Sequence, residues 1–289
     1  MEALLSTLFL KTKAKFFRLL ILLLVVLALP LQQAQAKTVV LVHGFLSDSQ
    51  IWKTSGFTRA LQKTEYIDGG VYSFNPVGML IPYPSARAPQ NIFYTVELPS
   101  QTNLQTQESL LVQYLQQIYS QRQEPLTLVG HSAGGVISRL YLLDPIHMPV
   151  NGLITIATPH LGTPTANLAY LAGNSPIGMM VSMVGEDALQ DSRGLFSDLK
   201  EEKPGTFLYW MNHQPHPDIH FASIIRKNES ISKPNKFDFI VPPFSQDMNN
   251  IWSLKGRSGV AITTDNHALN YKDGLVVVDI LKHITSPKK

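Results

Sequence analysis

The sequence of 289 residues contains no cysteine. Disulfide bonds, thiolate metal sites and a cysteine nucleophile are therefore excluded. Only 16% of the residues are charged and 44% are hydrophobic, which is the composition of a folded globular protein rather than a disordered one. The sequence also lacks internal repeats and low-complexity tracts. Its length suffices for one large α/β domain or two small ones.

The chain lacks an excess of basic residues outside its first 36 positions. Residues 1–36 hold four of the 24 Lys and Arg residues and one of the 21 Asp and Glu residues, which leaves 20 of each and a formal net charge of zero. A protein that binds nucleic acid is expected to present a basic surface. The composition therefore predicts no nucleic-acid partner.

A hydrophobic run long enough for a bilayer is also missing. The strongest run, LLILLLVVLAL (19–29), is about half the length that a transmembrane helix needs. Four basic residues precede it and the small-residue segment AQA (34–36) follows, which is the pattern of a secretory signal peptide. We predict a signal peptide over 1–36, cleavage near Ala36 and export to the periplasm or out of the cell. An uncleaved N-terminal membrane anchor is the alternative.

The remaining chain, 37–289, alternates short apolar runs with helical patterns. The runs predict strands at 38–42, 92–98, 126–129, 153–157, 219–225 and 260–263, and the apolar spacing predicts helices at 104–119, 135–143 and 274–284. Buried strands alternating with helices are typical of a mostly parallel sheet with helices on both faces. We predict one α/β domain over 37–289, with a long ordered loop over 67–91 and an inserted cap over about 160–216.

The segment GHSAGG (130–135) joins a predicted strand to a predicted helix. Its first five residues fit the pattern G-x-S-x-G, in which a serine hydroxyl projects from a sharp turn. Gly130 and Gly134 would let the strand and the helix pass close together, and Ser132 would then be a nucleophile. An ordinary glycine-containing turn is the alternative.

A serine nucleophile needs donors for the negative charge that develops on its substrate. The segment LVHGF (41–45) follows the first predicted strand, and its turn can direct the N–H of Phe45 toward the N–H of Ala133. These two groups are the predicted oxyanion hole. His43, Gly44 and Leu46 beside it are candidate substrate contacts, although His43 is also explained as a residue that packs the turn.

Three motifs resemble the bacterial lipase and esterase branch of the α/β-hydrolase fold. They are VLVHGF (40–45), LVGHSAGG (128–135) and IATPHLGTP (156–164), and ALQDSRGLFSDL (188–199) is similar to a segment that follows the cap helix in lipases and related deacylases. The likeness runs from Val39 to about Ile284. It implies an α/β-hydrolase fold with an inserted cap and a hydrolase that requires no cofactor.

The resemblance also implies that an acid and a base follow the serine in the chain. Asp238 stands three residues before Val241 and matches the family pattern D-x-x-V-P. Such an aspartate orients the imidazole and stabilises its charged form. Asp247 and Asp218 are the alternative acids.

The family keeps its base on a loop after the last strand, where this chain has His267. A base must lie within reach of the serine proton. His283, in the predicted terminal helix, and His160, in the TPHLGTP segment, are the alternatives.

The cap carries the sequence evidence on substrate. SPIGMMVSMVG (175–185) is apolar and includes Met179, Met180 and Met183, which are flexible side chains suited to irregular apolar ligands. It predicts either a lid that covers an acyl chain or transiently contacts a lipid surface, or a packed core helix.

The segment HQPHPDIH (213–220) has three histidines and one aspartate, which are side chains that can bind zinc. Pro215 and Pro217 prevent a regular helix that would align the histidines. We therefore predict no metal site there.

Together these motifs predict an exported lipase-like esterase that cleaves carboxylic esters through an acyl-enzyme, with Ser132, Asp238 and His267 as its triad. The same triad serves a lipid deacylase, a phospholipase, a thioesterase or an acyltransferase. A catalytically inactive binding protein that retains the fold is a third hypothesis. The motifs do not bear on oligomeric state.

Overall fold

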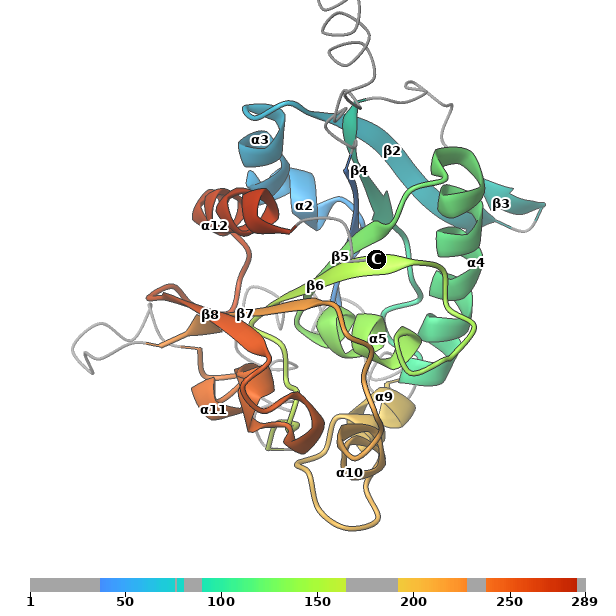
Figure 1. The fold of residues 1–289 in the computed structure, drawn as a ribbon. Helices are drawn as coiled ribbons and strands as arrows, with labels where there is room; N and C mark the ends of the chain where they lie inside the picture. The colour runs from blue at the N-terminus through green and yellow to red at the C-terminus, as the bar shows by residue number, and fades with distance from the viewer. Residues whose placement is uncertain (1–36, 76, 81–89, 165–191, 228–237, 285–289) are drawn as a thin grey trace, which may run out of the picture. The chain divides into compact units, whose positions relative to one another are not determined.

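A computed structural model of the protein describes residues 37–75, 77–80, 90–164, 192–227 and 238–284. Within these ranges the strands form one eight-stranded sheet in the order β3-β2-β4-β1-β5-β6-β7-β8 (Figure 1). The strands are β1 (Thr38–Val42), β2 (Tyr66–Asn75), β3 (Gly78–Leu80), β4 (Asn91–Val96), β5 (Leu126–His131), β6 (Val150–Ile156), β7 (His220–Arg226) and β8 (Ser258–Thr263). Neighbouring strands are parallel, except that β2 and β3 are antiparallel.

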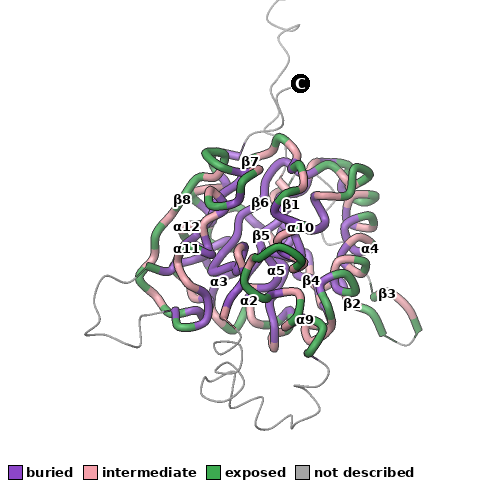
Figure 2. Tube along the Cα trace, turned by 90° about the horizontal axis from the view of Figure 1, so that it is seen from below, coloured by how far each residue is buried: buried purple, intermediate pink, exposed green. Residues whose placement is uncertain are grey.

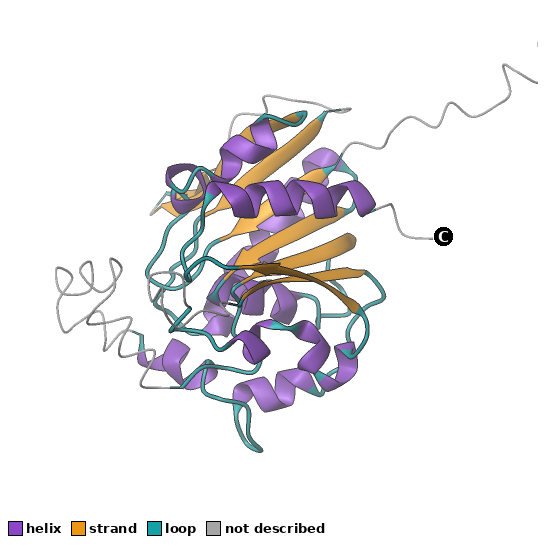
Figure 3. Cartoon of the chain, turned by 90° about the vertical axis from the view of Figure 1, so that its left-hand side faces the viewer, coloured by secondary structure: helices purple, strands orange, loops and turns teal. Residues whose placement is uncertain are grey.

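Helices cover both faces of the sheet (Figure 3), with α2, α3 and α12 on one side and α4 and α5 on the other (Figure 1). The helices are α2 (Ile51–Thr54), α3 (Phe57–Gln62), α4 (Leu104–Arg122), α5 (Ala133–Tyr141), α9 (Arg193–Asp198), α10 (Phe207–Asn212), α11 (Pro243–Gln246) and α12 (Tyr271–His283), and η2 (Met248–Asn250) and η3 (Trp252–Leu254) are single 3-10 turns. None of the helices in the described ranges combines the length and the apolar character needed to span a bilayer.

The apolar core lies in two layers because successive side chains of a strand point to opposite faces. In β1, Val39 and Leu41 join the cluster that contains Trp52 and the inner face of α12, whereas Val40 and Val42 join the cluster under α4 and α5. All five residues of β1 are buried, and buried backbone runs through the middle of the molecule (Figure 2). A β-branched run buried on both faces explains why the sequence of β1 shows no polar alternation.

The six predicted strands and three predicted helices are all present, with bounds that differ by a few residues. The prediction of a long loop over 67–91 is wrong, because β2 and β3 occupy 66–75 and 78–80. Gly69 and Gly70 interrupt the alternation of β2, and its register with β4 shifts between Asp68 and Val71. Gly69 is needed there since a Cβ would lie 2.3 Å from the ring of Tyr94 in β4.

The parallel arrangement brings distant loops to one edge of the sheet. The carboxyl ends of β1, β5, β6 and β8 lead into residues 43–46, 132, 157–163 and 264–270, respectively. Ligands of open α/β sheets bind at this edge. The fold therefore places the three resemblance motifs and the predicted base together.

The predicted cap, 160–216, includes residues 165–191, which lie outside the described residues. Its described ends pair with each other, because the N–H of Thr163 donates to the Leu199 carbonyl at 3.1 Å. The Thr163 hydroxyl donates to the Ile240 carbonyl, and the N–H of Leu161 donates to Ser245 Oγ at 3.1 Å. The base of the insertion is therefore bonded to the loop that contains Asp238.

Candidate active site

Ser132 lies on a sharp turn between β5 and α5. Its backbone has φ 52° and ψ −128°, in a region that residues other than glycine rarely adopt. Helix α5 lies so close to the end of β1 that a Cβ on Gly134 would lie 2.3 Å from the Val42 carbonyl oxygen. A Cβ on Gly130 would lie 2.4 Å from the Cα of Gly135. Gly130 therefore serves the close crossing of β5 and α5, as the sequence predicted, whereas Gly134 lets α5 approach the end of β1. Ser132 itself remains partly exposed.

Ser132, His267 and Asp238 form a continuous hydrogen-bonded chain. The Oγ of Ser132 lies 2.9 Å from Nε2 of His267, and Nδ1 of His267 lies 2.9 Å from Oδ2 of Asp238. A carboxylate only accepts, so Nδ1–H donates to Asp238 and leaves Nε2 free to accept the serine proton. This is the geometry that a general base requires.

The carboxyl group of Asp238 is buried among hydrogen-bond donors. Its Oδ1 accepts from the N–H groups of Ile240 (2.9 Å) and Val241 (3.0 Å), and its Oδ2 accepts from Gln246 Nε2 (3.0 Å) as well as from His267. Burial alone raises the pKa of Asp238, but His267 and these backbone donors outweigh burial and hold the pKa below its ordinary value. The group therefore stays ionised beside the imidazole.

Two residues that support this arrangement were not predicted from the sequence. Gln246 donates to Asp238 and, at 2.7 Å, to the Val241 carbonyl, while its Oε1 accepts from the N–H of Arg226 at 2.7 Å. Arg226 in turn pairs with Asp273 inside the protein. The sequence signal for Gln246 was its place on a short proline-initiated helix just after the D-x-x-V-P pattern.

The predicted oxyanion loop lies directly against the serine. A Cβ on Gly44 would lie 2.8 Å from Ser132 Cβ and 3.3 Å from the N atom of Ala133, so only glycine fits there without displacing backbone. Ala133 is the first residue of α5, where N–H groups lack partners within the helix and carry partial positive charge. The N–H groups of Phe45 and Ala133 have no hydrogen-bond partner among the described residues. They remain available for a substrate oxygen.

His43 is a buried part of the turn after β1. Its Nδ1–H donates to the Gly44 carbonyl at 3.1 Å, and its Nε2 accepts from the N–H of Leu98 at 3.0 Å. With both nitrogens engaged, the ring serves the turn, which favours the packing role over substrate contact. Leu46 is half-buried against the core, and its contact with substrate stays a prediction. Met179, Met180 and Met183 lie outside the described residues.

Neither alternative acid is bonded to the base. Asp247 caps η2 by accepting from the N–H of Asn249 at 2.9 Å. Asp218 is exposed and lies 3.8 Å from a guanidinium nitrogen of Arg257. The structure therefore places Asp238, and not these two, in contact with His267.

His160 is fully buried in a different network. Its Nδ1 accepts from Arg139 at 3.3 Å, which fixes the proton on Nε2, and Nε2 lies 3.0 Å from Thr155 Oγ1. Burial and the guanidinium of Arg139 hold the pKa of His160 well below its ordinary value. With both nitrogens engaged away from Ser132, His160 is a structural residue.

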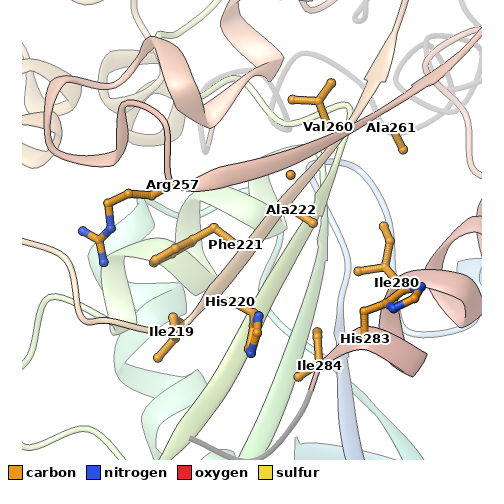
Figure 4. Close-up of a pocket in the computed structure, with 11 residues that line it drawn as sticks. Ile219, His220, Phe221, Ala222, Arg257, Val260, Ala261, Ile280, His283 and Ile284 are labelled. Carbon is orange, nitrogen blue, oxygen red and sulfur yellow. The ribbon is translucent and has the colours of Figure 1, made fainter. Parts of the chain in front are cut away.

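His283 lies at the opposite end of the sheet from Ser132. It lines a pocket of about 420 Å³ together with His220 and Phe221, at the start of β7, and Ile280 of α12 (Figure 4). Ser132 follows the end of β5, and β5, β6 and β7 are parallel, so the pocket and the serine are at opposite edges. His283 is therefore not placed to act as its base.

The histidine-rich segment 213–220 engages its own surroundings. His213 Nδ1 bonds to the Tyr209 carbonyl at 2.7 Å, and His216 Nδ1 lies 3.0 Å from both the Gln214 carbonyl and Ser253 Oγ. Within the described ranges, no three histidine or carboxylate side chains are grouped in a way that could hold a metal ion.

Comparisons with known proteins agree with this architecture. Residues 93–172 match the family model described as a PGAP1-like alpha/beta domain. The mature form of Bacillus licheniformis lipase BlEst2 superposes with a TM-score of 0.57 at 16% identity, covering 88% of this chain and 94% of that chain. This protein has the α/β-hydrolase fold. The lin2722 product of Listeria innocua is similar to this α/β-hydrolase-fold chain to the same degree, with a TM-score of 0.57, 16% identity, and coverage of 86% and 92%.

An esterase is also similar to this α/β-hydrolase-fold chain. The Exiguobacterium antarcticum esterase EaEST gives a TM-score of 0.51 at 15% identity, with 86% of this chain and 92% of that chain covered. The comparison with curated proteins finds no match. At these identities the similarity concerns the fold, and the chemistry has to be argued from the site itself.

Proposed function

We propose that this protein is a serine hydrolase that cleaves carboxylic esters, as a lipase-like esterase. The observation that carries the proposal is the pair of 2.9 Å contacts that joins Ser132 to His267 and His267 to Asp238. The strained backbone of Ser132 and the free N–H groups beside it add support. The names of two similar structures, a lipase and an esterase, agree with this chemistry.

In the first half of the proposed reaction, Ser132 Oγ attacks the ester carbonyl carbon while His267 Nε2 takes the hydroxyl proton. The imidazolium that results is stabilised by the ionised Asp238 at Nδ1. The carbonyl oxygen becomes an oxyanion and accepts from the N–H groups of Phe45 and Ala133. Collapse of this intermediate breaks the bond to the alcohol oxygen, which receives the proton from His267, and leaves an acyl-serine.

In the second half, water replaces the alcohol. His267 Nε2 takes a proton from water as its oxygen attacks the acyl carbon, and the same N–H groups hold the second oxyanion. The acyl–Oγ bond then breaks, Ser132 Oγ recovers its proton from His267, and the carboxylic acid leaves. The side chains of this scheme all belong to the described residues, and no step calls for a cofactor.

Apolar side chains next to the predicted oxyanion loop support an apolar acyl group in the substrate. The rings of Phe45 and Phe196 of α9 pack edge to face with their centroids 5.2 Å apart. Leu46 follows Phe45 and is half-buried. An acyl chain that lies along these side chains would be removed from water, which is favourable by roughly 0.8 kcal/mol per methylene group.

The test is hydrolysis of chromogenic esters with acyl chains from short to long. We expect activity in the protein without residues 1–36, and a loss on the order of 10⁴-fold or more in Ser132→Ala and in His267→Ala. His283→Ala, at the other edge of the sheet, is the matched histidine control and should retain full activity. Full activity in His267→Ala together with loss in His283→Ala would reverse the assignment of the base.

Product analysis separates the other chemistries that the same site could perform. In an acyltransferase, added alcohols compete with water for the acyl group. A phospholipase would hydrolyse phospholipids faster than simple esters, and a thioesterase would hydrolyse thioesters faster than simple esters. A protein that binds these compounds but turns none of them over would be an inactive binding protein. That outcome would end the hydrolase proposal.

We also infer export of the protein from its first 36 residues, which lie outside the described residues. N-terminal sequencing of the protein from the producing cell should begin at Lys37. Recovery of the full-length chain from the membrane fraction would instead support an uncleaved anchor.

A further inference from the structure

His131 is a buried imidazole immediately before the serine, at the last position of β5. Its Nε2 lies 2.8 Å from the main-chain carbonyl oxygen of His267, and the two rings are 5.2 Å apart at 46°. A carbonyl oxygen only accepts, so Nε2 of His131 carries the proton and donates it. The geometry thus connects the residue before the nucleophile to the backbone of the base.

The other nitrogen of His131 has no hydrogen-bond partner within the described ranges, although it is buried. An unpaired buried nitrogen is destabilising, and a leucine would fill a similar volume without that cost. Burial, together with the charge that His267 carries when protonated, lowers the pKa of His131 to about 3. The ring therefore stays neutral through the reaction, so that it donates one bond and does not compete as a base.

The bond from His131 is one of those that hold the irregular segment carrying His267. Residues 264–270 connect β8 to α12 without regular secondary structure. Two successive carbonyls of this loop are held by side chains from neighbouring strands. His131 of β5 bonds the carbonyl of His267, and Arg226 of β7 bonds the carbonyl of Ala268 at 3.2 Å. Arg226 is itself fixed by its buried pair with Asp273.

We propose that His131 is a positioning residue, which fixes the backbone of His267 so that its ring contacts both Ser132 and Asp238. The proposal rests on the proposed function, in which His267 is the base. The His267 side chain bridges two fixed groups at 2.9 Å each, and a shift of its backbone moves both contacts at once. Displacement of a catalytic group by about 1 Å can cost on the order of 100-fold in rate.

Three variants test this role by ester hydrolysis. His131→Leu removes the donor and keeps the volume, and we expect kcat to fall about 10- to 100-fold with KM changed less than about twofold. His131→Gln carries an amide N–H that reaches the same carbonyl, and it should restore kcat to within about threefold of the wild type. His216→Leu is the matched control, because His216 is another buried histidine whose pKa is lowered to about 3 by burial, and its bonds are to Gln214 and Ser253. It should leave kcat unchanged.

Two kinetic outcomes would overturn the proposal: an unchanged kcat in His131→Leu, or a His131→Gln protein no more active than His131→Leu while both are folded.

Nuclear magnetic resonance of ¹⁵N-histidine-labelled protein provides a test that needs no substrate. In the wild type we expect His131 to remain the neutral Nε2–H tautomer from pH 5 to 8, and the Nδ1 proton of His267 to resonate far downfield because it is shared with Asp238. That downfield signal should broaden or disappear in His131→Leu and return in His131→Gln.

An ordinary titration of His131, or an unchanged downfield signal in His131→Leu, would contradict the positioning role. If the expected spectra are observed but no ester is hydrolysed, the result would contradict the proposed function and leave the positioning role of His131 intact.

Discussion

Replacing Asp238 by asparagine isolates the charge and the acceptor geometry of the predicted acid at nearly constant volume. Both oxygens of Asp238 only accept, two bonds from the backbone at Oδ1 and two from Gln246 and His267 at Oδ2. An asparagine must put its NH₂ group at one of these positions. The oxygen is expected at the Oδ1 position, where two backbone donors are fixed, which leaves the NH₂ group facing His267.

An NH₂ group at that position reverses the bond to the imidazole. His267 can then accept at Nδ1 only if its proton moves to Nε2, and an Nε2–H cannot take the proton of Ser132. The wrong tautomer costs on the order of 10⁴-fold in kcat, which corresponds to about 5.4 kcal/mol of transition-state stabilisation at 1.36 kcal/mol per decade. KM should change little, because Asp238 is buried behind the ring.

The assay is kcat for a chromogenic ester, with circular dichroism to show that the Asp238→Asn protein is folded. A folded variant that retains more than about a tenth of the wild-type kcat would refute the tautomer argument. It would also remove Asp238 from the triad.

Three further predictions concern stability, each measured by urea unfolding. Gly134→Ala should lower the free energy of unfolding by about 1–3 kcal/mol, since the added Cβ meets the Val42 carbonyl oxygen at 2.3 Å. Gly259→Ala is the control, because its Cβ meets no atom closer than 3.8 Å, and it should change the free energy of unfolding by less than about 0.5 kcal/mol. Equal effects of the two substitutions would contradict the close approach of α5 to the end of β1. Gln246→Leu removes a donor to the buried Asp238 carboxylate and should cost about 1.5–3 kcal/mol, and wild-type stability would mean that this bond contributes nothing. The pKa of His131 is about 3 in the folded protein and near 6.5 in the unfolded chain, so the unfolded chain binds the proton first as the pH falls. The contribution of neutral His131 to the free energy of unfolding is therefore complete above pH 6.5, and about 2 kcal/mol of it is lost by pH 5. His131→Gln should reduce the loss of stability between pH 7.5 and 5, and an unchanged loss would contradict the pKa shift.

The central strands that were predicted from the sequence share a simple physical signal, which the edge strand β8, largely exposed, does not have. A strand buried on both faces is apolar throughout, as in β1 and in most of β6, and such runs are visible without a structure. β2 gave no such signal, because Gly69 and Gly70 disrupt its alternation. The reason for Gly69 lies in another strand, where the ring of Tyr94 covers it, and a single sequence does not reveal that contact.

The residues of the candidate site also fall into those that the sequence predicts and those that it does not. Ser132 could be predicted because the turn that presents it demands small residues at fixed spacing, and the resemblance supplied Asp238 and His267. His131 could not be predicted, because its one hydrogen bond reaches a residue 136 positions further along the chain. Gln246 stands on a short helix just after the D-x-x-V-P pattern, but its bonds to Asp238, Val241 and Arg226 are seen only in the folded chain.

The central claim is that the Ser132 hydroxyl is activated by His267, and covalent labelling tests it most directly. A fluorophosphonate reacts with an activated serine whatever ester the enzyme prefers, and mass spectrometry of the digested protein locates the adduct. We expect the phosphonyl group on the peptide that contains Ser132, no such adduct in Ser132→Ala, and labelling at least about 10³-fold slower in His267→Ala. A folded wild-type protein without label on Ser132, or labelling that is equally fast in His267→Ala, would contradict the account.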